Sequence, residues 1–264
     1  MYFKKMKFKG TLFIKGSVRI ICAISLISVL LMPAYSMATD PDVTANISIA
    51  QSYTKNTDKR VKAIQSLGES GEESAFLPLL TILKDVNEEQ GIRSCAARAL
   101  TNLGKPRLEI IHALEEVFRE KTTGKNLGYT ILLLIGKMQS LESIKLFSDA
   151  LINADSMTRF KAAQALGHMQ REEALRLLTL HYNHEQDKIV RAEVVRALGQ
   201  YENATAEEML SDILRNDPEP LVRMNAALML GKYEKLSTQA RKALEAASED
   251  TSSSVQKAVK GILR

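Results

Sequence analysis

The same phrase recurs along most of this chain at a nearly constant interval. "VRAEVVRALGQ" occupies residues 190–200, and close copies stand at 59–69, 158–168 and 222–232. We take the glycine near the end of each phrase as its marker. The equivalent positions are Gly68, Thr101, Gly136, Gly167, Gly199, Gly231 and Arg264, at intervals of 33, 35, 31, 32, 32 and 33 residues. This regularity predicts an array of stacked units, because periods of roughly 20–50 residues are typical of solenoids.

Each phrase has the spacing of an amphipathic helix. In one copy Arg191, Val194, Val195 and Leu198 occupy positions i, i+3, i+4 and i+7 of a single face. A second helical pattern fills the intervals, at 72–85, 141–151, 171–180 and 206–217. Each unit is therefore predicted to be two antiparallel helices that must stack on the next pair. The terminal glycine is expected to end its helix in the left-handed conformation.

Two stretches carry a resemblance to a known family. "DPEPLVRMNAALMLGK" (217–232) and "RVKAIQSLGESGEESAFLPLLTILKD" (60–85) resemble HEAT repeats, specifically the short bacterial variety called phycobilisome-lyase-type HEAT-like repeats. The resemblance covers residues 58–264. It implies an all-α fold, an α-α superhelix or HEAT-like solenoid of about thirteen antiparallel helices, counted as six pairs and one capping helix.

The resemblance also implies a ladder of charged side chains along the stack. In HEAT proteins the arginine eight residues before the marker usually meets an acidic residue from a turn. The matching positions here are Arg60, Arg93, Arg159, Arg191 and Arg223. Asp217 precedes Arg223 by six residues and is expected to serve it, and Asp187 lies near Arg191. Gly128 takes the arginine's place in the third copy, so the ladder should be interrupted there.

The first 38 residues have the composition of a leader. They contain six basic residues and no acidic one, and an apolar stretch at 20–32 is followed by Pro33, Ser36 and Ala38. We predict a signal peptide at 1–38, cleaved after Ala38, which would send the chain to the periplasm or outside the cell. The alternative is an uncleaved inner-membrane anchor formed by residues 20–38. Without these six residues the chain has 36 − 6 = 30 basic and 31 acidic residues, so its basic character does not indicate nucleic-acid binding.

The remaining chain divides into two parts. Residues 39–57 are predicted to form an N-terminal capping helix, and residues 58–264 the repeat solenoid. Cys95 is the one cysteine outside the leader, so no intrachain disulfide is expected there, and its thiol is expected to be unreactive.

The sequence offers little for catalysis. None of the histidines His112, His168, His181 and His184 lies in an HExxH motif. His181 and His184 are three residues apart beside Glu185, but two histidines are too few for a convincing zinc site, so a polar turn is the simpler interpretation. Whether they bind a metal stays open. No metal site, no cofactor and no enzymatic activity are predicted.

Two enzyme families resemble this architecture. Deoxyhypusine hydroxylases use paired His-Glu motifs to hold two irons, whereas this chain has a single such pair, His184-Glu185. Phycobilin lyases share the repeat type but work inside the cell, and the leader argues against that role.

The best candidate for a binding surface is a row of side chains on the repeated helices. Positions seven, six and three before each marker should face the concave side of a solenoid. We call the following residues the strip: Arg98, Tyr129, Leu133, Phe160, Arg196, Met224 and Leu228. Aromatic residues, methionine and arginine are enriched at protein interfaces. The alternative is that these side chains merely lie over their own helices.

The predicted function is a secreted or periplasmic scaffold or adaptor with a protein partner. The alternative is an accessory lyase-like or chaperone-like protein whose groove binds a chromophore or a modified peptide.

The repeat spacing makes Leu198 a buried core residue. Replacing Leu198 by alanine should leave a cavity and lower the free energy of unfolding by roughly 2–5 kcal/mol. Chemical denaturation measures this, and an unchanged midpoint would show that the helical phase is assigned wrongly.

Overall fold

The computed structural model describes residues 40–53, 56–105 and 107–263. The predicted signal peptide and its alternative as an anchor lie outside these residues. The described chain is all-α, with fourteen α-helices and two short 3-10 helices, Glu73–Ala75 and Leu141–Ser143. The expected number of about thirteen was one too low. The expectation counted six pairs and one capping helix, whereas seven helices carry the phrase, six connect them and α2 precedes them.

The helices fall into two alternating sets. The motif helices, which carry the phrase, are α3 (Thr57–Glu69), α5 (Gln90–Leu103), α7 (Lys125–Met138), α9 (Ser156–Met169), α11 (Lys188–Leu198), α13 (Pro220–Leu230) and α15 (Ser253–Ile262). The connecting helices are α4 (Phe76–Lys84), α6 (Arg107–Arg119), α8 (Ile144–Leu151), α10 (Glu172–Tyr182), α12 (Ala204–Asn216) and α14 (Thr238–Ala247), and α2 (Pro41–Gln51) precedes them all.

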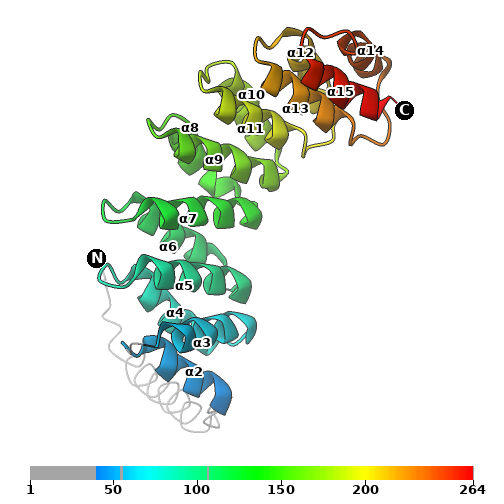
Figure 1. Ribbon diagram of the computed structural model, residues 1–264. Coiled ribbons are helices and arrows are strands. Elements are labelled where there is room, and N and C mark those ends of the chain that lie inside the picture. The colour runs from blue at the N-terminus through cyan, green and yellow to red at the C-terminus, as the bar shows by residue number, and fades with distance from the viewer. Residues whose placement is uncertain (1–39, 54–55, 106, 264) are drawn as a thin grey trace, which may run out of the picture. The chain divides into compact units, whose positions relative to one another are not determined.

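Within the unit Asp42–Arg264, each motif helix packs on the next one along the chain. Each connecting helix packs on the motif helix that follows it, so consecutive pairs stack in order (Figure 1). The apolar stripe predicted from the phrase is buried between them. Val194, Val195 and Leu198 of α11, for example, are fully inaccessible to solvent.

The marker glycines are contact points between motif helices. A Cβ atom on Gly68 would lie 2.6 Å from Ala99 Cα, and one on Gly136 would lie 2.5 Å from the carbonyl oxygen of Ala165. Real Cβ atoms do not come this close to backbone, so these positions need glycine for close approach. The glycine lets one helix backbone rest almost directly on the next.

The expectation that the marker glycine ends its helix in the left-handed conformation is wrong. Gly199 has φ −66° and Gly231 has φ −65°, both right-handed. The left-handed residue comes three positions later, as in Gly104 (φ 75°), Gln139 (φ 54°) and Gln170 (φ 51°).

The arginine ladder runs from each repeat to the next. In five motif helices the arginine pairs with a carboxylate in the turn that leads into the following motif helix. The pairs are Arg60–Glu88 (2.5 Å), Arg93–Glu120 (2.8 Å), Arg159–Glu185 (2.8 Å), Arg191–Asp217 (3.0 Å) and Arg223–Asp250 (2.8 Å).

All five of these guanidinium groups also donate to backbone carbonyl oxygens. Arg191 Nη1 donates to the carbonyl oxygens of Glu185, at 3.1 Å, and Gln186, at 3.4 Å, in the turn before its own helix. One side chain therefore ties two consecutive turns together. The hydrogen bond from Arg60 lowers the pKa of the Glu88 carboxyl, and the one from Arg223 does the same for Asp250.

Two expected ladder partners are corrected by this geometry. The carboxylate of Asp217 binds Arg191 of the preceding repeat, and only its backbone carbonyl accepts from Arg223, at 2.8 Å. Asp187 caps α11 by accepting from the backbone N–H of Ile189.

At Gly128 the ladder is replaced by a different contact. Asp155, in the turn before α9, accepts from Lys125 Nζ at 3.0 Å and from the Tyr129 hydroxyl at 2.9 Å. It also caps α9 through the backbone N–H of Thr158. Hydrogen bonds from Thr158, Lys125 and Tyr129 hold the pKa of the Asp155 carboxyl well below its usual range. Helix α7 is therefore bound to the turn before α9 through Lys125 and Tyr129 instead of an arginine.

The close contact at Gly136 predicts a substitution effect. Gly136→Ala should lower the free energy of unfolding by about 1–3 kcal/mol, because the new Cβ overlaps the backbone of Ala165. Gly91→Ala is the matched control, since a Cβ on Gly91 of α5 meets nothing within 4 Å. It should be neutral or stabilising by about 0.4–1 kcal/mol. Equal denaturation midpoints for the two variants would contradict the contact role of Gly136.

The ladder makes a second prediction. Arg191→Ala should cost about 3–5 kcal/mol of stability, because it leaves the buried carboxylate of Asp217 unpaired. Adding Asp217→Asn should restore part of the loss by removing that charge. Arg176→Ala, which breaks the exposed pair with Glu172, should leave the unfolding midpoint nearly unchanged. A midpoint for Arg191→Ala as high as that of Arg176→Ala would show that the ladder is dispensable.

Candidate functional site

The strip runs along the motif helices from α5 to α13. Arg98, Arg196 and Leu228 are exposed, with Leu228 at 41%. The other four residues are half-buried, and two of them, Leu133 and Met224, also pack against the core. The side chains most available for contact are therefore the two arginines and Leu228, and parts of Phe160 and Met224 are also accessible.

Phe160 has two cationic groups close to its ring. Arg196 Cζ is 6.0 Å from the centre of its ring, and Lys161 Nζ is 5.3 Å away. Both distances are in the range of cation–π attraction. A partly exposed aromatic ring near two cations is a suitable contact point for a partner's side chain.

Tyr129 has a structural contact. Its hydroxyl donates to Asp155 at the position where the ladder lacks an arginine. Replacing Tyr129 would therefore disturb the stack as well as the strip.

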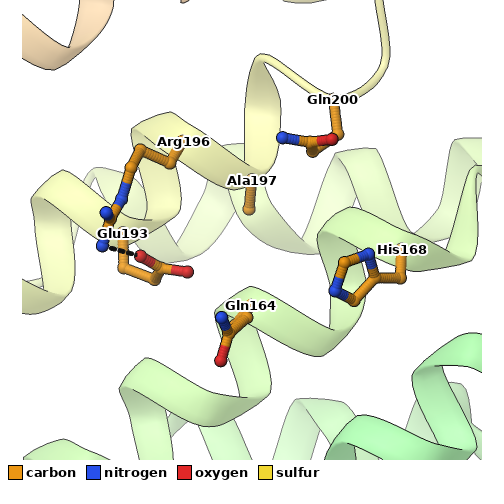
Figure 2. A pocket seen from close by; sticks show the side chains of 6 residues that line it. All are labelled: Gln164, His168, Glu193, Arg196, Ala197 and Gln200. Atoms are coloured by element: carbon orange, nitrogen blue, oxygen red, sulfur yellow. Dashed lines mark hydrogen bonds and ion pairs between the residues drawn. The ribbon is translucent and has the colours of Figure 1, made fainter.

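A small pocket opens between α9 and α11 on the strip (Figure 2). It has a volume of about 200 Å³ and is lined by Gln164, His168, Glu193, Arg196, Ala197 and Gln200. Glu193 is only 5% exposed and forms an ion pair with Arg196. Burial raises the pKa of the Glu193 carboxyl, although Arg196 opposes the change. The lining can recognise polar groups by hydrogen bonds.

The sequence interpretation missed Glu193. The only sequence feature that could have indicated Glu193 is an acidic residue six positions before the marker. The neighbouring copies have Lys161 and Asn225 there. The pocket itself depends on Gln164 and Arg196 meeting across two repeats, which no local pattern reveals.

The histidines considered for metal binding lie at the end of α10. His181 Nε2 is 2.8 Å from Glu185 Oε2, and burial lowers the pKa of the imidazole. Glu185 is already bound by Arg159, and His184 is exposed. Among the described residues there is no group of three or more His, Cys, Asp or Glu side chains that could hold a metal ion.

Cys95 is half-buried on α5. Burial raises the pKa of its thiol, which disfavours the reactive thiolate. No helix in the described part of the chain is long and apolar enough to span a bilayer.

Solved structures with similar folds are distant in sequence. Human deoxyhypusine hydroxylase in complex with glycerol is 20% identical over 84% of this chain and 87% of its own, with a TM-score of 0.40. The complex of CpcE and CpcF of phycocyanin lyase from Nostoc sp. PCC7120 is 17% identical over 88% and 97%, with a TM-score of 0.49. An engineered protein is 21% identical over 85% and 96%, with a TM-score of 0.34.

The comparison with curated proteins gave no match. The model of HEAT repeats matches residues 123–195 and 180–262, which together are more than half of the chain. HEAT repeats generally mediate protein interactions. With its two-helix units and stacked motif helices, this chain belongs to the HEAT-repeat family.

Proposed function

We propose that this protein is a non-catalytic scaffold or adaptor that binds a protein partner along the strip. The observation that carries the proposal is the row of arginine, phenylalanine, methionine and leucine side chains left accessible on successive motif helices. These residue types supply much of the binding energy at protein interfaces, apart from leucine, which adds apolar area. The finer resemblance to phycobilisome-lyase-type repeats rests on the sequence motif alone.

The state of the ladder carboxylates supports a non-catalytic role. Glu185, Asp217 and Asp250 each accept hydrogen bonds from a ladder arginine. A carboxylate held in this way is a poor general acid or base, because its oxygens are already occupied by hydrogen bonds. The role of these acids is to hold consecutive repeats together.

We also propose that the protein acts outside the cytosol, in the periplasm or beyond the cell. The support is the leader composition of residues 1–38. The alternative is an inner-membrane anchor at 20–38, which would leave the repeats on the same side of the membrane. The strip could bind a partner whether the leader is cleaved or kept as an anchor.

A capture experiment with two matched variants tests the scaffold. The strip variant carries Phe160→Ala, Met224→Ala and Leu228→Ala, and it spares Tyr129. The control variant carries Leu77→Ala, Ile152→Ala and Leu180→Ala, three exposed apolar residues away from the motif helices. The full chain and both variants are incubated with an envelope extract after circular dichroism has shown that all three are folded.

We expect the full chain and the control variant to retain the same partner, and the strip variant to lose it. Equal capture by all three would place the interface elsewhere. Capture of nothing by any of them would contradict the scaffold and favour the lyase-like or chaperone-like alternative.

A further inference from the structure

A second hollow lies between α5 and α7, two junctions before the pocket of Figure 2. It has a volume of about 390 Å³. Three basic side chains, Arg98, Arg107 and Lys137, line it together with Thr101, Leu134 and Met138, and its lining contains no acidic residue. Arg98 belongs both to this hollow and to the strip.

The hollow exists because this junction departs from the repeat. At the other junctions the marker is glycine, and the next motif helix rests on it. Here the marker is Thr101, and the equivalent facing residue is Leu134 where the neighbouring junctions have Ala99 or Ala165. Two larger side chains replace a glycine and an alanine, so the ends of α5 and α7 cannot approach as closely.

The charges around the hollow are unbalanced. None of Arg98, Arg107 and Lys137 forms an ion pair with any described residue. Nine of the thirteen described arginines do form one, and two of the four that do not are Arg98 and Arg107. The C-terminal ends of α5 and α7 offset part of the repulsion among them. The remaining positive charge faces open space.

We propose that this hollow, the basic pocket, binds an acidic side chain of the protein partner that lies on the strip. The inference rests on the proposed function and names the chemistry of the partner. Arg98 and Arg107 supply planar forks that match a carboxylate, and Lys137 adds a third charge. Leu134 and Met138, at 9% and 8% exposure, form an apolar wall, so an acidic residue beside an apolar one fits best.

The test uses the full chain and a fluorescein-labelled synthetic peptide, Glu-Glu-Leu-Glu-Glu-Leu-Glu-Glu, with binding measured by fluorescence anisotropy. A second peptide has glutamine at every glutamate. The pocket variant carries Arg98→Gln and Lys137→Gln. Its matched control carries Arg241→Gln and Lys242→Gln, which removes the same charge from exposed positions on α14.

We expect the acidic peptide to bind the full chain and the control variant equally. The pocket variant should bind roughly tenfold more weakly or worse, the loss that follows from removing charged hydrogen bonds. The glutamine peptide should not bind. Equal affinity for pocket and control variants would overturn the inference, because binding would then reflect net charge alone. Displacement of the peptide by inorganic phosphate, but not by acetate at equal ionic strength, would overturn it in favour of a phosphate site.

The same variants separate this inference from the proposed function. If the pocket variant captures the partner as well as the full chain does, while the strip variant fails, the acidic contact is wrong and the scaffold stands. If the peptide binds through Arg98 and Lys137 but no capture depends on the strip, the partner binds elsewhere and the proposed strip interface is wrong.

Discussion

Successive motif helices meet at the marker glycines, through backbone or through a side chain of the next helix, and the rest of the stack depends on that contact. At Gly68 and Gly136 even a methyl group would overlap the neighbouring helix. This approach fixes the separation of the helices and brings their apolar stripes together, so that residues such as Leu166 and Leu198 are fully buried. The connecting helices then cover the remaining apolar faces. Packing of this density tolerates little change in volume.

A second contact fixes each motif helix near its other end. The ladder arginine stands eight residues before the marker, or about 12 Å along the helix axis. Two contacts at that distance determine the rotation of one helix against the next. Two junctions lack one of them. Between α7 and α9 the arginine is missing, and Asp155 with Lys125 and Tyr129 takes its place. Between α5 and α7 the glycine is missing, and the basic pocket opens at that end.

The repeat period, the helical phase and the arginine positions could all be predicted from the sequence, because they recur at fixed spacing. The role of the glycine could not, since a glycine near a helix end fits both a cap and a close contact. The left-handed residue three positions later was hidden because Gln139 and Gln170 occupy it. The sequence also did not show which arginine the Asp217 carboxylate binds. Its carboxylate accepts from Arg191, and its backbone carbonyl accepts from Arg223 of the next repeat. Glu193 and the basic pocket combine residues from two repeats, which meet only once the stack is formed.

Stacking occupies most positions of a repeat, so function is left to the positions that stacking does not use. The strip meets this condition, because its residues vary from copy to copy while the buried stripe stays apolar. The residues of the basic pocket are a clearer case of positions that stacking does not use. Other junctions form without three unpaired cations, and gathering such charges costs free energy, so Arg98, Arg107 and Lys137 are not explained by stability. A cluster that the fold does not need, placed where the regular contact is absent, is explained by a ligand of opposite charge.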